Sequence, residues 1–185
     1  EISLGLVGSE MCIRDSVYHI RITSTSKEYV LGRPRTKTYT DPDGTTYEGT
    51  GDGADNQKIV SPSFMIASQL GLVESDAGIK NMQQAASHCE KYVEYVYRDR
   101  YIRNERIEDM ICYDDWRLPT EAELRIISNF QTGSEVMDVV LDRPNYWSAG
   151  GEIEGVGTGV ASDGTLMSGT GVRCVRDHYR GEEGK

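Results

Sequence analysis

Alternating apolar and polar side chains near the start of the chain predict a β-strand. Tyr18, Ile20 and Ile22 fall on one face of it, because successive side chains of a strand point to opposite sides. Residues 58–73 form the first strongly apolar segment and are expected to enter the core. Between the two, a Pro-Asp-Gly turn at 42–44 predicts a solvated hairpin, since a similar-looking calcium loop would need a closing Glu that is absent.

The middle of the chain carries apolar residues at helical spacing. The buried stripe comprises Ile79, Met82, Ala86, Cys89, Val93 and Val96. With Ser75 or Asp76 as N-cap, this spacing predicts a helix over 77–96. The charged stretch 97–109 follows, and its alternating signs predict a solvated face or an inserted loop rather than a binding patch.

A second helix is predicted over 120–130. Thr120 and Glu123 form a capping box, in which each side chain satisfies a backbone amide of the other residue. Leu124, Ile127 and Phe130 then give the helix a buried face. Beyond it, NYWSAG, GVGTGVASDGTLMSG and VRCVRD are typical of strands joined by glycine turns, with a hairpin signal at Asp163-Gly164. The predicted fold class is α+β.

Composition narrows the possible partners. The chain has 185 residues, 37% hydrophobic and 27% charged, which indicates a globular domain, and no apolar run is long enough to span a membrane. Its formal net charge of −10 would repel nucleic acid and anionic lipid alike, so neither is an expected partner.

The first sixteen residues resemble the translation of a sequencing adapter rather than protein, most clearly in LVGSEMCIRDS. Without them the chain is expected to begin inside a longer protein. The predicted organisation is an artefact at 1–16, a strand and loop from an upstream domain at 17–57, the main domain at 58–180 and a polar tail at 181–185.

Three separated motifs carry a family resemblance: WRLPTEAEL at 116–124, YWSA at 146–149 and VRCVRD at 172–177. Together they resemble the C-type-lectin-like domains that end bacterial surface and fimbrial-tip proteins of gut anaerobes. The resemblance implies two helices packed on one small twisted antiparallel sheet, which would contain 146–149 and 172–175. It also implies a disulfide between the first helix and the last strand, which here would join Cys89 to Cys174.

The residues allow this bond without requiring it. Cys89 lies on the predicted buried stripe, and Cys174 shares a strand face with Val172. A Cys89–Cys112 bond and a fully reduced chain remain alternatives. No CxxC occurs, so neither a zinc ribbon nor a thioredoxin-like site has support.

The motif WRLPTEAE is also similar to that of formylglycine-generating enzymes, which share the lectin-like fold. Those enzymes need a reactive cysteine pair near the C-terminus, whereas here only Cys174 follows Cys112. The three histidines lie in no recognisable catalytic motif. We therefore predict no enzyme and no catalytic residues. Structural roles are expected instead: Trp116 and Leu118 in the core, and Arg117 bridging carboxylates or carbonyls.

A ligand is expected at the irregular loops between Asn145 and Gly171. The Glu-Pro-Asn and Trp-Asn-Asp motifs of calcium-dependent lectins are missing, so no metal or cofactor is predicted. The candidate ligand-binding residues are Asn145, Trp147 and Asp163. Core packing is the alternative for Trp147, and turn formation for Asp163.

The resulting functional prediction is a non-catalytic recognition or adhesion module at the C-terminus of an exported bacterial cell-surface or fimbrial-tip protein. A host glycan, a host protein or other surface or pilus subunits would be its partners. The alternative is a structural cap that binds no ligand.

Overall fold

The computed structural model describes residues 18–22, 26–32, 38–40, 46–48, 57–68, 78–133, 139–161 and 163–178. The predictions for the adapter-like start at 1–16, the turn at 42–44 and the tail at 181–185 lie outside these residues.

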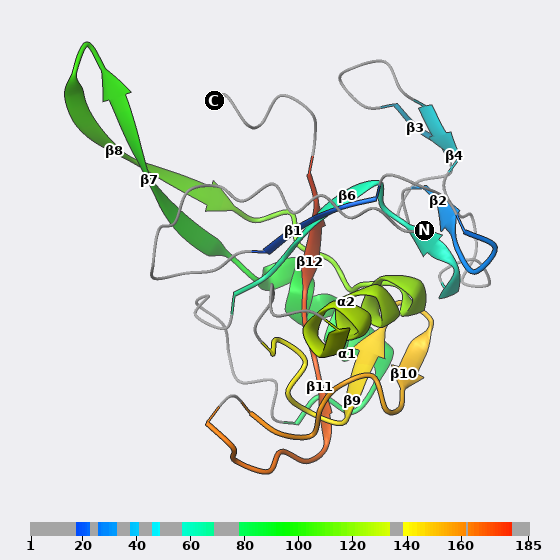
Figure 1. Ribbon diagram of the computed structural model, residues 1–185. Helices are drawn as coiled ribbons and strands as arrows, with labels where there is room; N and C mark the ends of the chain where they lie inside the picture. The colour runs from blue at the N-terminus through cyan, green and yellow to red at the C-terminus, as the bar shows by residue number, and fades with distance from the viewer. Residues whose placement is uncertain are drawn as a thin grey trace.

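Among the described residues, two three-stranded sheets organise the fold (Figure 1). The first has the order β1-β6-β12, all antiparallel, and comprises β1 (Tyr18–Arg21), β6 (Ser63–Ile66) and β12 (Val175–Asp177). The second has the order β10-β9-β11, with a parallel β9–β11 pair, and comprises β9 (Asn145–Ser148), β10 (Gly151–Ile153) and β11 (Thr170–Gly171).

The remaining strands form pairs. These are β2 (Val30–Leu31) with β5 (Ile59–Val60), β3 (Thr38–Thr40) with β4 (Thr46–Glu48), and β7 (Glu94–Ile102) with β8 (Glu105–Tyr113). The helices are α1 (Met82–Lys91) and α2 (Glu121–Gly133). This combination confirms the α+β class. None of the helices described is long and apolar enough to cross a membrane.

The helices lie between the two three-stranded sheets (Figure 1) and share in two apolar clusters. The first cluster joins Leu124 and Ile127 of α2 to the inner faces of β1, β6 and β12, including Phe64 and Ile66. The second joins Ala85 and Cys89 of α1 to Trp116, Leu118 and Cys174. Trp116 and Leu118 are therefore core residues, as predicted.

Helix α1 is shorter than the predicted helix over 77–96. It begins after Asn81, whose Oδ1 accepts a hydrogen bond from the amide of Gln84 at 2.9 Å. It ends before Tyr92, which has the extended angles φ −68° and ψ 130°. The next segment, VEYVYRDRYI, is rich in β-branched and aromatic residues and pairs with β8 along its length. Val93 and Val96 therefore lie beyond the helix, and the prediction for them was wrong.

The charged stretch 97–109 is neither a bare loop nor a helix face, because it forms the outer part of the β7–β8 hairpin. The pairing runs from Glu94 opposite Tyr113 to Ile102 opposite Glu105. Arg103 and Asn104 make the turn with φ of 52° and 68°. Positive φ at both central residues is what a two-residue hairpin turn demands, and Gly usually supplies it. The missing Gly hid the hairpin in the sequence.

The prediction that 146–149 and 172–175 share one antiparallel sheet was wrong. Strand β9 lies in the second sheet, whereas β12 pairs with β6 in the first. The chain crosses between sheets at 172–174, just after Gly171. Gly171 lies against Tyr146, since a Cβ there would be 2.8 Å from the tyrosine ring. This close approach belongs to the parallel β9–β11 pair, which a hairpin-based prediction does not anticipate.

The described part of 17–57 belongs to the same core as the rest of the chain. Ile20 and Ile22 are buried in the first cluster, and β1 is a strand of the β1-β6-β12 sheet. Because this cluster also contains Phe64 and Ile66 of β6, the predicted boundary at 57 does not divide it.

Candidate functional site

A disulfide joins Cys89 of α1 to Cys174, as the resemblance implied. The two Cα atoms are 5.5 Å apart, and both residues are buried. Cys112 is free and exposed on β8, so the alternative Cys89–Cys112 pairing is not formed. The bond ties α1 to the crossover between the two sheets.

The WRLPT motif forms a buried ion cluster. Arg117 pairs with both carboxylate oxygens of Glu123 at 2.8 Å and with Asp177 Oδ1 at 2.9 Å. Glu123 also accepts hydrogen bonds from the amides of Ser61 and Thr120, each at 2.9 Å. Every strong donor and acceptor of the pair thus has a partner, which buried charges require.

The electrostatic balance at Arg117 favours the charged form. Burial lowers the pKa of this guanidinium, but the carboxylates of Asp177 and Glu123 raise it more, so the pKa stands above its usual value. The capping box of Thr120 and Glu123 is confirmed, since Thr120 Oγ1 accepts from the Glu123 amide at 3.2 Å. One cluster therefore joins the start of α2 to β5 and β12.

Two further arginines connect separate segments. Arg176 of β12 forms an ion pair with Asp115 at 2.6 Å, and its guanidinium lies 4.2 Å from the centroid of the Tyr113 ring. Arg173 is buried, and its Nη atoms donate to the carbonyls of Ala67 and Val140. Its Nε has no hydrogen-bond partner. These contacts hold the base of the hairpin and the segment before β9.

Close backbone packing supports the loops at 145–171. The Gln131 side chain of α2 accepts from the amides of Val140 and Leu141 and donates to the Leu141 carbonyl. Thr158 donates its amide to the same Leu141 carbonyl at 2.9 Å. At Gly157 a Cβ would lie 1.8 Å from the Arg143 carbonyl oxygen, so only glycine fits there.

Gly157→Ala is therefore expected to lower the free energy of unfolding by about 2 kcal/mol, the usual scale of overpacking at a rigid site. Urea denaturation measures it. Gly150→Ala is the matched control, because the nearest atom to its added Cβ would be Cγ of the flexible Gln57 side chain at 3.1 Å, and the next atoms lie at the ordinary contact distances of 3.7 and 4.0 Å. Equal effects of the two substitutions would contradict the close packing at Gly157.

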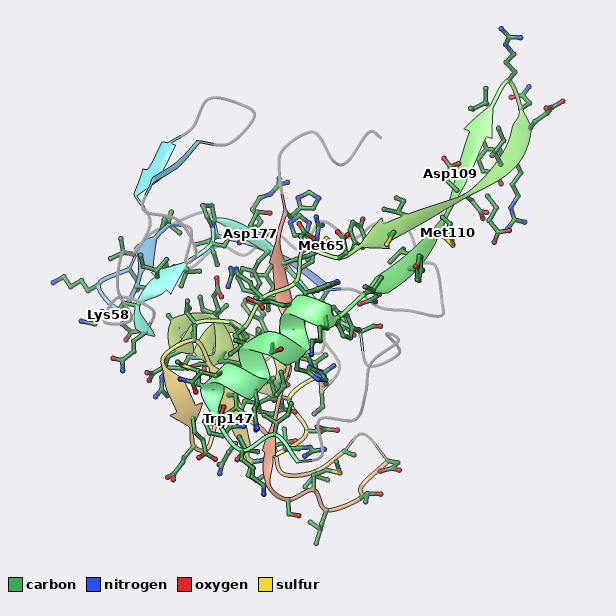
Figure 2. All side chains as sticks on the ribbon, turned by 180° about the vertical axis from the view of Figure 1, so that it is seen from behind. Lys58, Met65, Asp109, Met110, Trp147 and Asp177 are labelled. Carbon is green, nitrogen blue, oxygen red and sulfur yellow. A yellow bond between two sulfur atoms is a disulfide. The ribbon has the colours of Figure 1, made fainter. Side chains whose placement is uncertain are left out.

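Asn145 and Trp147 share one face of β9, opposite the buried Tyr146 and Ser148. The Asn145 side chain accepts from the Gly155 amide at 3.3 Å and so positions the loop after β10. Trp147 packs on the second apolar cluster, which agrees with the alternative of core packing, although its Nε1 has no partner. Figure 2 shows Trp147 near α1 at the loop end of the molecule.

Asp163 lies at the tip of a separate turn, as its Asp-Gly signal predicts. Ala161 donates to the Thr165 carbonyl at 2.9 Å, Val160 bridges to Leu166, and Gly164 has φ +86°. The exposed Asp163 carboxylate accepts from the Thr165 amide at 2.9 Å, and this bond lowers the pKa of Asp163. No hydrogen bond joins Asp163 to Asn145 or Trp147, so the three candidates do not form one polar cluster.

Tyr146 is the titratable group beneath these loops. Burial raises its pKa from 10.0 to about 12; Arg173 opposes the rise, and Asp142, which accepts the phenol hydrogen bond at 2.9 Å, adds to it. The folded state thus holds the phenol proton more tightly than the unfolded state does. This contribution to stability is complete below pH 10 and is lost as the pH rises through about 12.

The free energy of unfolding is therefore expected to fall by about 2 kcal/mol more in the wild type than in Tyr146→Phe between about pH 9 and pH 12. Denaturant titrations at several pH values measure the free energy of unfolding of both proteins. Contributions from lysines and other tyrosines cancel when the two values are subtracted. Parallel pH profiles of the two proteins would refute the raised pKa.

A contact on the outer face of the β1-β6-β12 sheet was not predicted. His19 Nε2 lies 2.5 Å from Ser63 Oγ, and the His19 ring lies 4.1 Å from that of His178. No local motif signals this cluster, since its members come from β1, from β6 and from the residue after β12. A serine bonded to an imidazole is one component of a nucleophilic site, so a test for catalysis would target Ser63 first.

Among the described residues, no group of three or more His, Cys, Asp or Glu side chains is arranged to hold a metal ion. Comparison with models of known protein families found no match, and comparisons with curated proteins and with solved structures also found none.

Proposed function

We propose that this chain is a non-catalytic recognition or adhesion module of an exported bacterial surface or fimbrial-tip protein, and that it has a C-type-lectin-like architecture. The resemblance of WRLPTEAEL, YWSA and VRCVRD to that family supports the proposal. The Cys89–Cys174 disulfide fits export, because such bonds persist in oxidising compartments.

The observation that carries the proposal is the contrast between the loops at 150–169 and their support. The segment is rich in glycine and exposes Glu152 on β10 and, in its loops, Glu154, Asp163 and Leu166. Their support comes from the packing of Gly157 against the Arg143 and Leu141 carbonyls, and from Gln131 of α2, which hydrogen-bonds the backbone of Val140 and Leu141. Variable exposed loops held by a rigid scaffold are the usual location of binding residues.

Binding of the full chain to glycan and host-protein arrays tests the proposal. Asp163→Ala is expected to abolish binding of any ligand so found while the protein stays folded. Loss of the hydrogen bond from the Thr165 amide lowers the melting temperature only slightly, because the turn is exposed. Glu108→Ala, an exposed acid on the hairpin, is the control and should bind normally. If Asp163→Ala and Glu154→Ala both bind like the wild type, this loop end is not the ligand site.

Two other functions give different results. A structural cap predicts no binding across broad arrays from a correctly folded protein. A formylglycine-generating activity would require a reactive cysteine pair near the C-terminus, but Cys174 is occupied by the disulfide and no other cysteine follows Cys112. Turnover of a cysteine-containing sulfatase peptide would overturn the non-catalytic proposal.

A further inference from the structure

The β7–β8 hairpin and the loops at 150–169 lie at opposite ends of the molecule. In Figure 1 the hairpin extends from the top left, whereas the loops between β10 and β11 lie at the bottom. Figure 2, turned by 180° about the vertical axis, shows the same separation, with Asp109 and Met110 on the projecting hairpin and Trp147 toward the loop end.

The tip of the hairpin is basic, although its outer part 97–109 as a whole holds four arginines and four acidic residues. The tip runs from Arg100, which lies opposite Ile107, to the turn, and contains three arginines against one acidic residue in a chain whose formal net charge is −10. Arg106 pairs with Asp99 at 2.9 Å, and Arg103 is exposed in the turn. The hairpin tip is therefore positively charged, whereas the rest of the chain has a net negative charge.

Apolar side chains accompany this charge. Tyr101 is 70% exposed and Met110 is 57% exposed, and Ile102 and Ile107 are also exposed. A two-stranded hairpin by itself is at best marginally stable in water, because it has no second layer on which to pack. The exposed apolar side chains and the missing layer both indicate that another surface covers this hairpin.

The loop end has the complementary character. Residues 144–172 contain three acidic residues, Glu152, Glu154 and Asp163, and no lysine or arginine. All three are exposed, and Leu166 beside them is 84% exposed. One end of the molecule is therefore basic and apolar, and the opposite end is acidic and apolar.

We propose that the tip of the β7–β8 hairpin of one copy docks on the 150–169 loop end of a second copy. Charge complementarity favours contact between the hairpin tip of one copy and the loop end of another. Two hairpin tips, or two loop ends, carry like charges and would repel each other. Because the complementary surfaces lie at opposite ends, the contact is head-to-tail and repeats along an open chain of copies. The inference rests on the proposed function and names the partner of its loop surface.

Charge reversal at each end tests the contact. The hairpin variant is Arg103→Glu with Arg106→Glu, and the loop variant is Glu152→Arg with Glu154→Arg. Each variant alone has like charges at both ends and is expected to sediment as a monomer at concentrations where the wild type associates. An equimolar mixture restores opposite charges at every contact and is expected to associate again. Glu90→Arg, at an exposed position in the last turn of α1, is the control and should behave like the wild type.

The salt dependence of self-association is a second test of the contact. The association constant of the wild type should fall about tenfold or more between about 0.01 M and about 1 M salt, as the Debye length falls from ~30 Å to ~3 Å. Melting temperatures verify that both variants are folded. A monomeric wild type at low salt, association unchanged in either variant, or a mixture that stays monomeric would each overturn the proposal.

The same proteins separate this inference from the proposed function. A monomeric wild type that binds a glycan or host protein on the arrays refutes only the head-to-tail contact. If the hairpin tip binds an acidic host protein and the chain does not self-associate, the partner of the tip is that protein and not a second copy. This result would overturn the proposal. A wild type that neither associates nor binds any array component fails both tests.

Discussion

Replacing both disulfide cysteines, Cys89→Ala with Cys174→Ala, is expected to lower the free energy of unfolding by about 4 kcal/mol. The bond closes a sequence separation of 85 residues, and without it the unfolded chain regains the entropy that this closure removes. The loss is a large fraction of the ~5–15 kcal/mol that stabilises a typical domain.

Urea denaturation of the variant and of the oxidised wild type measures this effect. Cys112→Ala is the matched control, because that thiol is free and exposed, and its removal should change stability by less than about 0.5 kcal/mol. A double variant as stable as the control would show that the bond contributes nothing to folding.

Glu123→Gln is expected to lower the free energy of unfolding by about 3 kcal/mol or more. The substitution leaves Arg117 buried with only Asp177 as counter-ion and presents an amide group where two carboxylate oxygens accepted N–H groups. Because the amide keeps only one oxygen, the substitution also breaks one of the bonds to the Ser61 and Thr120 amides, which weakens either the start of α2 or its contact with the segment after β5.

Glu121→Gln provides the comparison within the same helix turn. Glu121 pairs with Arg125 at 2.6 Å, but Arg125 is 58% exposed and Glu121 is only half-buried, so loss of this i,i+4 pair should cost less than about 0.5 kcal/mol. Thermal and urea unfolding of the two variants measures how much stability each substitution removes. Similar losses from both substitutions would mean that the buried cluster is no stronger than a surface ion pair.

Features governed by neighbouring residues were predictable. The Thr120–Glu123 box and the Asp163-Gly164 turn each depend on contacts within a few positions, and the structure has both. The alternation at the start of the chain likewise indicated a strand, which the structure has at Tyr18–Arg21. The beginning of α1 was misplaced because Ser75, Asp76 and Asn81 are all acceptable N-caps, and no local signal selects among them.

The candidate site was predictable only in part. The Asp163 position at an exposed tip follows from turn chemistry, and the possible packing role of Trp147 follows from strand alternation. The close packing around Gly157 and the cluster of Ser63, His19 and His178 could not be predicted from the sequence. Each brings together segments that are distant in the sequence.

Local sequence therefore accounts for the caps, the turns, the apolar faces and the α+β class, because their free energies arise within a few residues. The family resemblance supplied the Cys89–Cys174 pairing, which the residues alone left open. Strand partners required the folded chain: β12 pairs with β6 and not with β9, and residues 94–102 form a strand because β8 returns beside them. Backbone pairing is nearly independent of side-chain identity, so the partner of a strand is set by which apolar faces can be buried together across the whole molecule.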